Sequence, residues 1–275
     1  AQANPGRRTV ADLRALHRAG KRFAVATAWD RPTAEFAEAA GVDAILVGDS
    51  LAQVALGFES TVRVGMNELL HHTTAVVRAT RRALVIADMP FLSYPDVATA
   101  SGNAARFIRD AGAGAVKLEG GSGLAPIVEA LTRSGVPVIG HVGLTPQSAL
   151  RTGAPRAQGK RAEEARRLLA DARELEAAGA SGIVIELVPS ELAAAITARI
   201  GIPTIGIGAG PSCSAQVQVI ADLLGLAEAS PPRHARPYAD LRTEAVRALA
   251  AWRDDVATGS FPSSDQSIAA DDELR

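Results

Sequence analysis

The sequence predicts a (β/α)₈ barrel, an α/β fold in which eight parallel strands are each followed by a helix. From residue 22 onward, short apolar runs alternate with amphipathic segments. Many of these segments end at a glycine just before the next apolar run, as a helix C-cap requires. Short strand–helix–strand connections of this kind build a parallel sheet covered by helices. An open, doubly wound sheet is the main alternative, and periodicity alone does not separate the two.

Eight segments have the length and apolar character of buried strands. They are FAVATA (23–28), AILVG (44–48), ALVIA (83–87), AVKLE (115–119), PVIGH (137–141), GIVIE (182–186), PTIGI (203–207) and the weaker AQVQVI (215–220). A helix with the sequence VADLRALHRAG precedes the first strand, and YADLRTEAVRALAAWRDDV predicts a helix near the C-terminus. Eight strands in about 250 residues fit a closed barrel.

The domain organisation follows from the same reading. We expect one barrel domain over residues 1–260, which includes the leading and C-terminal helices, and a polar, partly disordered tail over 261–275. The polar segment 145–163 is expected to be a long loop after the fifth strand, and long loops are often functional lids.

Composition excludes several classes of protein. The 275 residues carry 29 basic and 30 acidic side chains, a net charge of -1, which does not indicate nucleic acid or an anionic membrane as partner. No apolar run of about 18 residues is present, so we expect no membrane span. The single cysteine, Cys213, excludes an intrachain disulfide framework and suits a reducing cytosol.

Ionisable side chains stand at the carboxyl ends of five consecutive expected strands, whose first halves are apolar. They are Asp49, Asp88, Lys117 with Glu119, His141, and Glu186. Lys117 and Glu119 are two residues apart, so in a strand they point to the same side. An unpaired buried charge costs several kcal/mol. Because barrels gather their chemistry at the carboxyl end, we expect both side chains to face the barrel axis there, among the other charges.

Three carboxylates, from Asp49, Asp88 and Glu119, would then converge. Three anions held close together repel, and one of them must take up a proton unless a cation lies among them. All-oxygen ligands suit a hard cation, and Mg²⁺ usually takes one or two carboxylates together with substrate oxygens and waters. The sequence therefore predicts a Mg²⁺ site, and no cysteine–histidine spacing indicates structural zinc.

A purely structural role is open for most of these groups. An aspartate after a strand is commonly a helix cap, Lys117 with Glu119 could be a plain internal ion pair, and His141 could be a hydrogen-bonded core histidine. Glu186 is harder to explain structurally, because it has no local partner in its apolar run. The tandem His71–His72 on an expected helix indicates a surface position.

The glycine-rich stretch 206–210 (GIGAG) could hold a phosphate through backbone N–H groups, but close backbone packing is its simpler explanation. Cys213, which follows that stretch, is interpreted as a structural side chain.

Taken in order, these residues resemble the ketopantoate hydroxymethyltransferase family. The matching stretches are RFAVATAWD, LVGDSLAQVALG, IADMPF, AGAGAVKLEGG, VPVIGHVGLTPQS, AQGK, LEAAGASGIVIELVP and IPTIGIGAG. They extend from about residue 10 to residue 226, nearly the whole core. The resemblance implies the barrel of the phosphoenolpyruvate/pyruvate superfamily, a cytoplasmic role in pantothenate biosynthesis, and a homodecamer of two stacked pentamers.

The resemblance also implies roles for individual residues. The acids that would bind Mg²⁺ are Asp49, Asp88 and Glu119, the last of them directly or through water. The groups that would hold the 2-oxo acid substrate are Asp49, Ser50, Asp88, Lys117 and His141. Glu186 would be the general base that removes the proton beside the ketone. The enolate would then take a hydroxymethyl group from the co-substrate 5,10-methylenetetrahydrofolate.

The surrounding loops depart from the family pattern. Arg63 stands where the family usually has proline, and residues 152–159 (TGAPRAQG) replace a GGxKVQG-like loop. Ser214-Ala215-Gln216 replaces Asp-Gly-Gln, and the tail reads FPSSDQSI (261–268) in place of an FP-x-x-EHSF-like end. We therefore expect a paralogue that performs the same reaction on a different 2-oxo acid.

Two other functions remain open. One is a metal-dependent aldolase or C–C lyase that acts on a 2-oxo acid with free formaldehyde or another aldehyde. The isocitrate lyase branch is disfavoured, since Cys213 lies outside any KKCGH-like motif. The other is a non-catalytic ligand-binding barrel subunit, against which the complete set of charged groups argues.

Overall fold

The computed structural model describes residues 6–153, 156–228 and 230–269. The chain divides into two compact units, residues 1–220 and residues 221–275, and each is described by itself.

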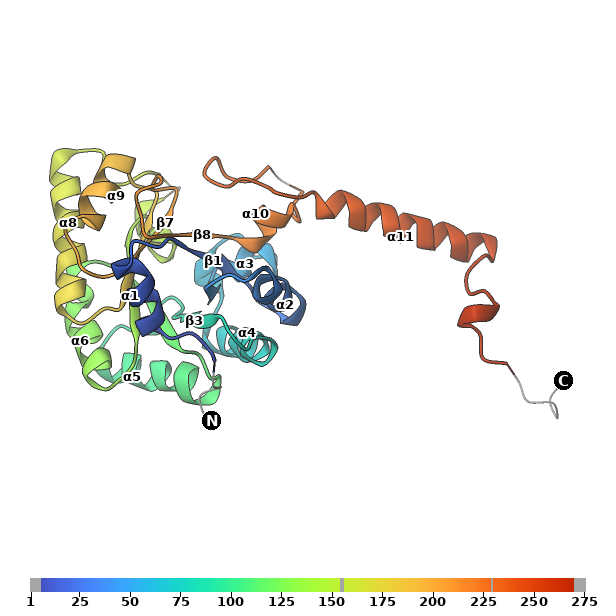
Figure 1. Cartoon of the computed structure of the whole chain (residues 1–275), viewed down its shortest axis with the longest axis horizontal. Helices are drawn as coiled ribbons and strands as arrows, with labels where there is room; N and C mark the ends of the chain where they lie inside the picture. Colours follow the sequence, from blue (N-terminus) through green and yellow to red (C-terminus); the bar gives the residue numbers. More distant parts are fainter. Residues whose placement is uncertain (1–5, 154–155, 229, 270–275) are drawn as a thin grey trace. The chain divides into compact units, whose positions relative to one another are not determined.

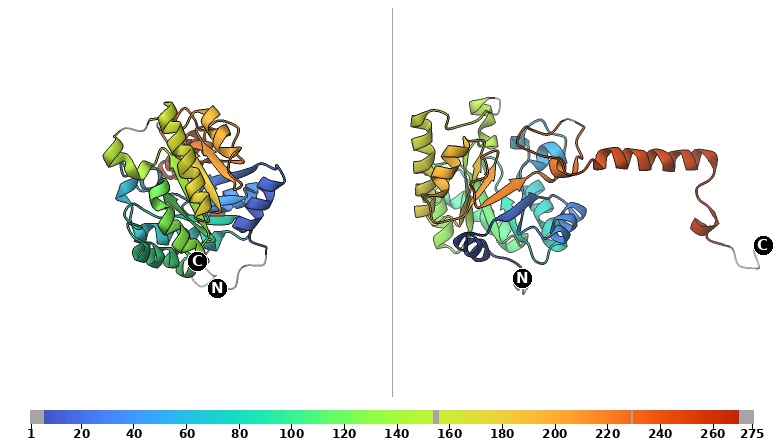
Figure 2. Two further views of the ribbon diagram at one scale, coloured as in Figure 1. Left: turned by 90° about the vertical axis from the view of Figure 1, so that its left-hand side faces the viewer. Right: turned by 45° about the horizontal axis from the view of Figure 1, so that its top comes forward.

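The first unit is a closed barrel of parallel strands that follow one another in sequence order, inside a ring of helices (Figures 1 and 2). The strands are β1 (Phe23–Thr27), β2 (Ala44–Val47), β3 (Leu84–Asp88), β4 (Ala115–Glu119), β5 (Val138–Gly143), β6 (Gly182–Glu186), β7 (Thr204–Ile207) and β8 (Ala215–Gln218). Strand β8 pairs with β1, with Phe23 opposite Ala215 and Val25 opposite Val217. This closure confirms the predicted barrel and excludes the open sheet.

Helices connect the strands on the outside. They are α1 (Val10–Arg18), α2 (Arg31–Ala40), α3 (Leu51–Val54), α4 (Met66–Ala79), α5 (Val97–Ala105), α6 (Ala125–Arg133), α7 (Ala149–Thr152), α8 (Ala162–Ala177) and α9 (Ser190–Thr197). Short 3₁₀ turns are η1 (Thr61–Arg63), η3 (Ser122–Leu124) and η4 (Pro146–Ser148), and the π-helix η2 (Arg106–Asp110) continues α5.

Local sequence explains where these helices begin and end. At α2, the Asp30 carboxylate accepts the N–H of Thr33 at 2.9 Å, which satisfies one of the free donors at the helix start. Gly41 ends the same helix with a left-handed φ of 78°, a conformation that glycine adopts without steric cost. Asp96 caps α5 in the same way as Asp30. The strand–helix junctions are therefore encoded locally.

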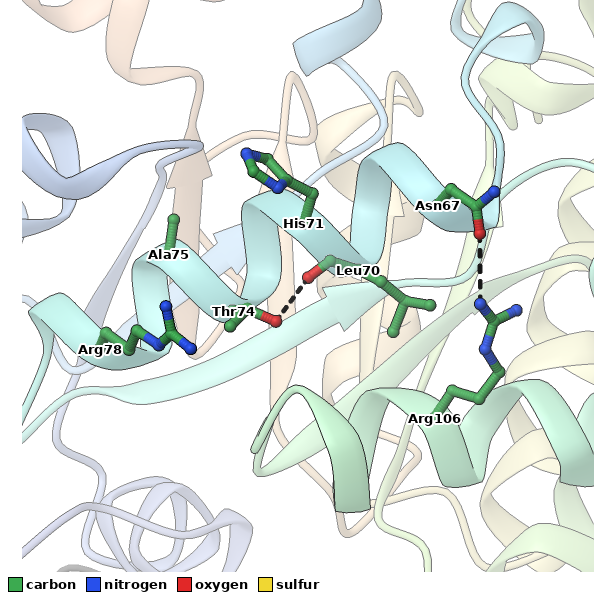
Figure 3. A pocket seen from close by; sticks show the side chains of 7 residues that line it. All are labelled: Asn67, Leu70, His71, Thr74, Ala75, Arg78 and Arg106. Atoms are coloured by element: carbon green, nitrogen blue, oxygen red, sulfur yellow. Dashed lines mark hydrogen bonds between the residues drawn. The ribbon is translucent and has the colours of Figure 1, made fainter.

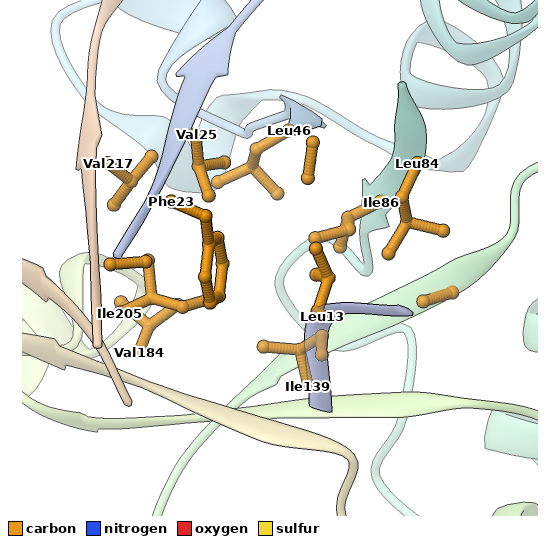
Figure 4. Packing of buried hydrophobic residues seen from close by; sticks show 13 residues of the cluster. Leu13, Phe23, Val25, Leu46, Leu84, Ile86, Ile139, Val184, Ile205 and Val217 are labelled. Atoms are coloured by element: carbon orange, nitrogen blue, oxygen red, sulfur yellow. The ribbon is translucent and has the colours of Figure 1, made fainter. Parts of the chain in front are cut away.

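Side chains alternate along the strands between the barrel interior and the helices outside. The interior cluster draws on all eight strands and on Leu13 of α1 (Figure 4). Its strand members are Phe23, Val25, Ala44, Leu46, Leu84, Ile86, Ala115, Ile139, Val184, Ile205, Ala215 and Val217. A cavity of only about 10 Å³ remains beside this cluster and Lys117. The barrel interior is thus filled by side chains, as in other barrels of this size.

All eight predicted strands are present, with shifts of one or two residues at their ends. Strand β5 runs two residues beyond the expected His141, because Gly143 still pairs with Glu186 of β6. The segment 145–163 is not a loop throughout, since Pro146 starts η4 and α7 follows it. Residues 154–155 of that segment lie outside the described residues.

The second unit contains α10 (Ile220–Leu224, which begins at the unit boundary), α11 (Leu241–Thr258) and the 3₁₀ turn η5 (Ser264–Gln266). Asp240 caps the start of α11, and Gly259 ends it in the left-handed conformation. Helix α11 confirms the helix predicted near the C-terminus. The end of the predicted tail, residues 270–275, lies outside the described residues, and the domain boundary at residue 260 stays a prediction. Among the described residues, no helix is long and apolar enough to cross a bilayer.

Candidate active site

The same alternation along the strands places both the apolar side chains and the charged side chains inside the barrel. On β3 the inward positions are Leu84, Ile86 and then Asp88, so the aspartate extends the same inward row at its carboxyl end. On β4, Lys117 and Glu119 follow inward-facing Ala115 in the same way. The apolar layers therefore lie below, and the charged layer lies at the carboxyl ends of the strands.

Three carboxylates converge in this layer, as the sequence predicts. Asp49 follows β2, Asp88 ends β3 and Glu119 ends β4, and each is buried. One oxygen from each lies within 4.8 Å of the others. A direct bond also joins two of them, because the backbone N–H of Asp49 donates to the side chain of Asp88, at Oδ2, over 3.1 Å. Groups that are 70 positions apart in sequence thus meet around a common point.

Lys117 supplies a positive charge to these acids. Its Nζ donates to Asp88 Oδ1 at 2.7 Å and to Glu119 Oε1 at 3.3 Å, and its side chain is 4% exposed. These contacts explain why a lysine is buried in a strand, because its charge neutralises part of a cluster of three anions. Burial lowers the pKa of a lysine, but the surrounding carboxylates outweigh burial and raise that of Lys117. Lys117 therefore stays charged.

His141 of β5 links the acid cluster to Glu186 of β6. Its Nδ1 lies 3.3 Å from Glu119 Oε1, and its Nε2 lies 3.3 Å from Glu186 Oε2. Both contacts are long for hydrogen bonds, so the attraction is mainly electrostatic. Burial and Lys117 lower the pKa of His141, yet the two carboxylates prevail and raise it to about 9. Glu186 is the most exposed of the three, at 15% of its side chain.

The acids differ in how readily they stay ionised. Burial, Asp88 and Glu119 together raise the pKa of Asp49 well above its ordinary value. Burial also raises the pKa of a glutamate, but Lys117 and His141 lower that of Glu119 to about 2. Burial and Glu119 also raise the pKa of Asp88, although Lys117 opposes them. The metal-free cluster therefore disfavours the ionised forms of Asp49 and Asp88, and of Asp49 most strongly.

This donor set fits a hard divalent cation. It offers carboxylate oxygens only, and a cation would relieve the repulsion that raises the pKa of Asp49. Within the part of the chain that the structure describes, Asp49 Oδ1 receives no hydrogen bond, whereas both oxygens of Asp88 do. Asp49 is accordingly the carboxylate with an oxygen to spare, and both Glu119 oxygens already have neighbours at 3.0–3.3 Å.

Comparison with known proteins decides the family. The profile described as ketopantoate hydroxymethyltransferase matches residues 7–264. The chain belongs to the ketopantoate hydroxymethyltransferase family.

Curated relatives in this family are similar over almost their full length. A 3-methyl-2-oxobutanoate hydroxymethyltransferase of Chloroflexus aurantiacus is 51% identical over 263 residues, which cover 96% of this chain and 93% of the relative. A protein of the same name from Moorella thermoacetica is 49% identical over 267 residues, covering 97% of this chain and 99% of the relative. The family resemblance found in the sequence motifs is confirmed.

Solved structures share the fold at low sequence identity. A phosphoenolpyruvate phosphomutase from Streptomyces platensis superposes with a TM-score of 0.61 at 18% identity, covering 96% of this chain and 92% of that one. A 2,3-dimethylmalate lyase, a member of the PEP mutase/isocitrate lyase superfamily, gives 0.58 at 18% identity, with 94% and 91% covered. The (β/α)₈ barrel fold expected from the sequence is thereby confirmed.

One buried residue of the site escaped the sequence analysis. Gln147, in η4, donates from its carboxamide to Asp49 Oδ2 at 3.1 Å and from its backbone N–H to Glu119 Oε2 at 3.0 Å. It stands in the stretch GLTPQS that resembles the family, but nothing in one sequence distinguishes it from an exposed loop glutamine. Only its burial, with 4% of the residue exposed, reveals it.

Other candidate groups lie away from this site. His71 is exposed beside a surface hollow of about 440 Å³ between α4 and η2, into which Arg106 reaches toward Asn67 (Figure 3). His72 is half-buried and donates to the backbone oxygen of Trp29 at 2.5 Å, so only the first of the two histidines is a surface residue.

The glycine-rich stretch at the end of β7 is closely packed. A side chain at Gly210 would overlap Ser190, and Gly206 lies against Cys213. Cys213 is buried. These contacts agree with a structural explanation for the stretch and for the cysteine.

Proposed function

We propose that this protein transfers a hydroxymethyl group to C3 of 3-methyl-2-oxobutanoate, with 5,10-methylenetetrahydrofolate as the one-carbon donor. The activity named for relatives about 50% identical over nearly their whole length supports the proposal. The observation in this chain that carries it is a fourth, separate carboxylate, Glu186, held 3.3 Å from His141 beside the three-acid cluster. An enolising enzyme needs both a cation site for the ketone and a base for the proton.

The substrate would be held at the three-acid cluster. Asp49, Asp88 and Glu119 would hold a Mg²⁺ ion, with Asp49 offering its free Oδ1. Asp88 and Glu119, whose oxygens all have protein neighbours, would act directly or through water. When bound, such an ion draws electron density from the ketone of a 2-oxo acid. The Lys117 ammonium lies at the same point and would stabilise negative charge that develops on the keto oxygen. Ser50, half-buried directly after Asp49, would orient the substrate carboxylate.

Glu186 would remove the C3 proton. His141 holds this carboxylate from one side, and the 15% exposure of its side chain leaves it open to a small molecule. The carbanion formed at C3 would attack the one-carbon unit, tetrahydrofolate would leave, and water would supply the hydroxyl oxygen. The residues thus divide into a charge-stabilising group on β2–β4 and a proton-accepting group on β5–β6.

Proton exchange tests this division of roles without any folate. We expect the metal-loaded protein to exchange the C3 proton of 3-methyl-2-oxobutanoate with deuterated water, as followed by NMR. Glu186→Gln should abolish the exchange, while Glu191→Gln, at an exposed glutamate in the first turn of α9, should leave it intact. Absence of exchange in the unaltered protein would contradict the proposal and favour a non-catalytic barrel.

A substrate panel tests the departures in the loops. The altered residues 152–159 and the tail led us to expect a paralogue for another 2-oxo acid, whereas the named relatives favour 3-methyl-2-oxobutanoate. Comparing kcat/KM across 2-oxo acids of increasing branch size separates these two outcomes. Comparing turnover with methylenetetrahydrofolate against free formaldehyde separates the transferase from an aldolase.

Location and assembly are further parts of the proposal. A chain with a single cysteine forms no internal disulfide, which supports a location in the reducing cytoplasm. Helix α11 supports self-association, because it exposes more than half the surface of Val246, Leu249 and Trp252, apolar side chains that a second copy of the chain would cover. Light scattering on the purified protein tests the homodecamer that the family resemblance implies.

A further inference from the structure

We infer that Gln147 is a positioning residue for the divalent cation: it holds Asp49 and Glu119 in place, and the Tyr94 hydroxyl holds Gln147. This inference rests on the proposed metal centre and adds two residues that have no role in it so far. Gln147 contacts neither substrate nor ion in this assignment, and it acts only through the carboxylates.

Gln147 joins the tops of three strands from a single position. Its Nε2 donates to Asp49 Oδ2 at 3.1 Å, beyond β2, and to the backbone oxygen of Met89 at 3.0 Å, directly after Asp88 of β3. Its backbone N–H donates to Glu119 Oε2 at 3.0 Å, at the end of β4. Gln147 is therefore hydrogen-bonded to Asp49 and Glu119 directly, and to Met89, the residue next to Asp88.

The orientation of the Gln147 carboxamide is fixed by its partners. The Met89 oxygen can only accept a hydrogen bond, so the nitrogen end of the amide must face it. The same nitrogen then reaches Asp49, and the oxygen end accepts from the Tyr94 hydroxyl at 2.6 Å. That hydroxyl also accepts the backbone N–H of Glu119 at 3.2 Å. Both amide hydrogens and the amide oxygen are satisfied, and a flipped amide would lose its bonds to Asp49 and to the Met89 oxygen.

These bonds select which carboxylate oxygens can reach a cation. Gln147 occupies Asp49 Oδ2, which leaves Oδ1 as the oxygen free to bind an ion. Without the carboxamide, Asp49 can rotate about its terminal torsion, which is broad and roughly two-fold, and its position is no longer defined. Partners outside the ligand shell commonly change metal affinity by about 10- to 100-fold when they are removed. Gln147 and Tyr94 stand in that relation to Asp49 and Glu119.

Binding of Mn²⁺ alone tests the inference independently of turnover. The full-length protein is stripped of metal with EDTA and titrated with Mn²⁺ by calorimetry and electron paramagnetic resonance. We expect Gln147→Met to weaken binding about 10- to 100-fold and to alter the Mn²⁺ resonance, because the ligand geometry changes. Gln216→Met is the control, since that exposed carboxamide also donates to a backbone oxygen, of Gly210, and has no carboxylate as a hydrogen-bond partner among the described residues. It should bind Mn²⁺ as the unaltered protein does.

Tyr94→Phe separates positioning from general loss of stability. Removing one hydroxyl should weaken Mn²⁺ binding less than Gln147→Met does. Its effect should be smaller in the Gln147→Met background than alone, because only its bond with the Glu119 backbone N–H is then left to lose. Thermal unfolding of the metal-free variants shows whether each is folded. If Gln147→Met does not fold, Tyr94→Phe and Gln147→Asn, which is too short to span the same partners, carry the test.

The outcomes distinguish this inference from the proposed function. Wild-type affinity and an unchanged resonance in folded Gln147 variants would overturn the positioning role and leave the metal centre standing. Independent, additive losses from the two substitutions would also overturn it. Failure of the unaltered protein to bind Mn²⁺ would overturn the metal centre, and with it this inference.

Discussion

The Lys117 ammonium lies 2.7 Å from Asp88 Oδ1, across directly paired positions of β4 and β3, and both side chains are almost wholly buried. The pair sits where the apolar layers of the barrel end. Its lysine faces two acids at hydrogen-bonding distance and a third nearby, so the cluster is short of positive charge. This imbalance has consequences for stability as well as for metal binding.

Removing the lysine charge should destabilise the metal-free barrel. Lys117→Met keeps much of the side-chain length but leaves Asp88 without its cation and Glu119 with His141 alone, and breaking a buried ion pair costs about 3–5 kcal/mol. Urea unfolding at pH 7 measures the loss in free energy of unfolding, with Lys21→Met at an exposed position as the control. We also expect Mg²⁺ to stabilise Lys117→Met. A variant as stable as the unaltered protein would contradict this account of the cluster.

Removing the negative charge of Asp49 should have the opposite effect on stability from removing the charge of Lys117. Burial and the neighbouring acids raise the pKa of Asp49, so its ionised form is disfavoured in the folded, metal-free protein. Asp49→Asn should therefore unfold at the same or higher urea concentration than the unaltered protein at pH 7, yet lose Mn²⁺ binding. Calorimetric titration and urea unfolding of the same preparation check both halves. A less stable Asp49→Asn would show that the carboxylate is structurally required.

Glu38 gives a pH dependence outside the site. Its carboxylate accepts the backbone N–H groups of Arg81, Arg82 and Ala83 at 3.1, 2.7 and 3.1 Å, in the turn before β3. Partial burial alone would raise its pKa, but these donors and the Arg82 charge lower it. Because the folded-state pKa lies below the unfolded one, the stabilisation is complete above the ordinary value of 4.5 and is lost as pH falls through the folded-state pKa.

Glu38→Gln should show this dependence directly. At pH 7 we expect it to lose about 1.5–3 kcal/mol in free energy of unfolding, since hydrogen bonds to a charged group are the stronger ones. The difference from the unaltered protein should shrink as the pH is lowered below 4.5. Glu35→Gln, at an exposed i,i+4 ion pair with Arg31, should change stability little at either pH. An equal loss at all pH values would argue against the charge as the cause.

Gly143 should tolerate no side chain. It has a φ of 98°, and a Cβ there would overlap the carbonyl oxygen of Glu186, so the substitution pushes β5 away from the proposed base. Gly143→Ala should cost more than the roughly 1–3 kcal/mol of backbone strain alone. Gly135→Ala, at a φ of 85° with open space around it, isolates that strain. Thermal unfolding and C3 proton exchange of the two variants make the comparison.

The barrel was predictable because its signals are local. Each strand is a short apolar run, many helices stop at or near a glycine, and the alternation on β4 alone places Lys117 and Glu119 on one face. For Asp49 the alternation of one strand is not enough, because it lies beyond the end of β2 and out of phase with the inward-facing Ala44 and Leu46. It was predictable only from the family resemblance and from the charges at the ends of all five strands taken together. Its role as the acid with a free oxygen depends on contacts from other strands, which no local pattern contains.

Gln147 and the helical turns η4 and α7 were beyond the reach of the sequence. A polar segment after a strand is typical of a loop. A proline such as Pro146 is compatible both with a loop and with the first residue of a helical turn, so it does not decide between them. The burial of Gln147 follows from four partners on β2, β3 and β4 and their loops, which only the closed barrel brings together.

The pairing of β8 with β1 sets an order of events during translation. Residues 49 to 186, which carry every proposed catalytic group, leave the ribosome before the strand at 215–218 that completes the sheet. A nascent chain that stops short of residue 215 thus exposes two unpaired, apolar sheet edges, at β1 and at β7. We therefore expect such a chain to be prone to aggregation, because the barrel closes only once its last strand has been released.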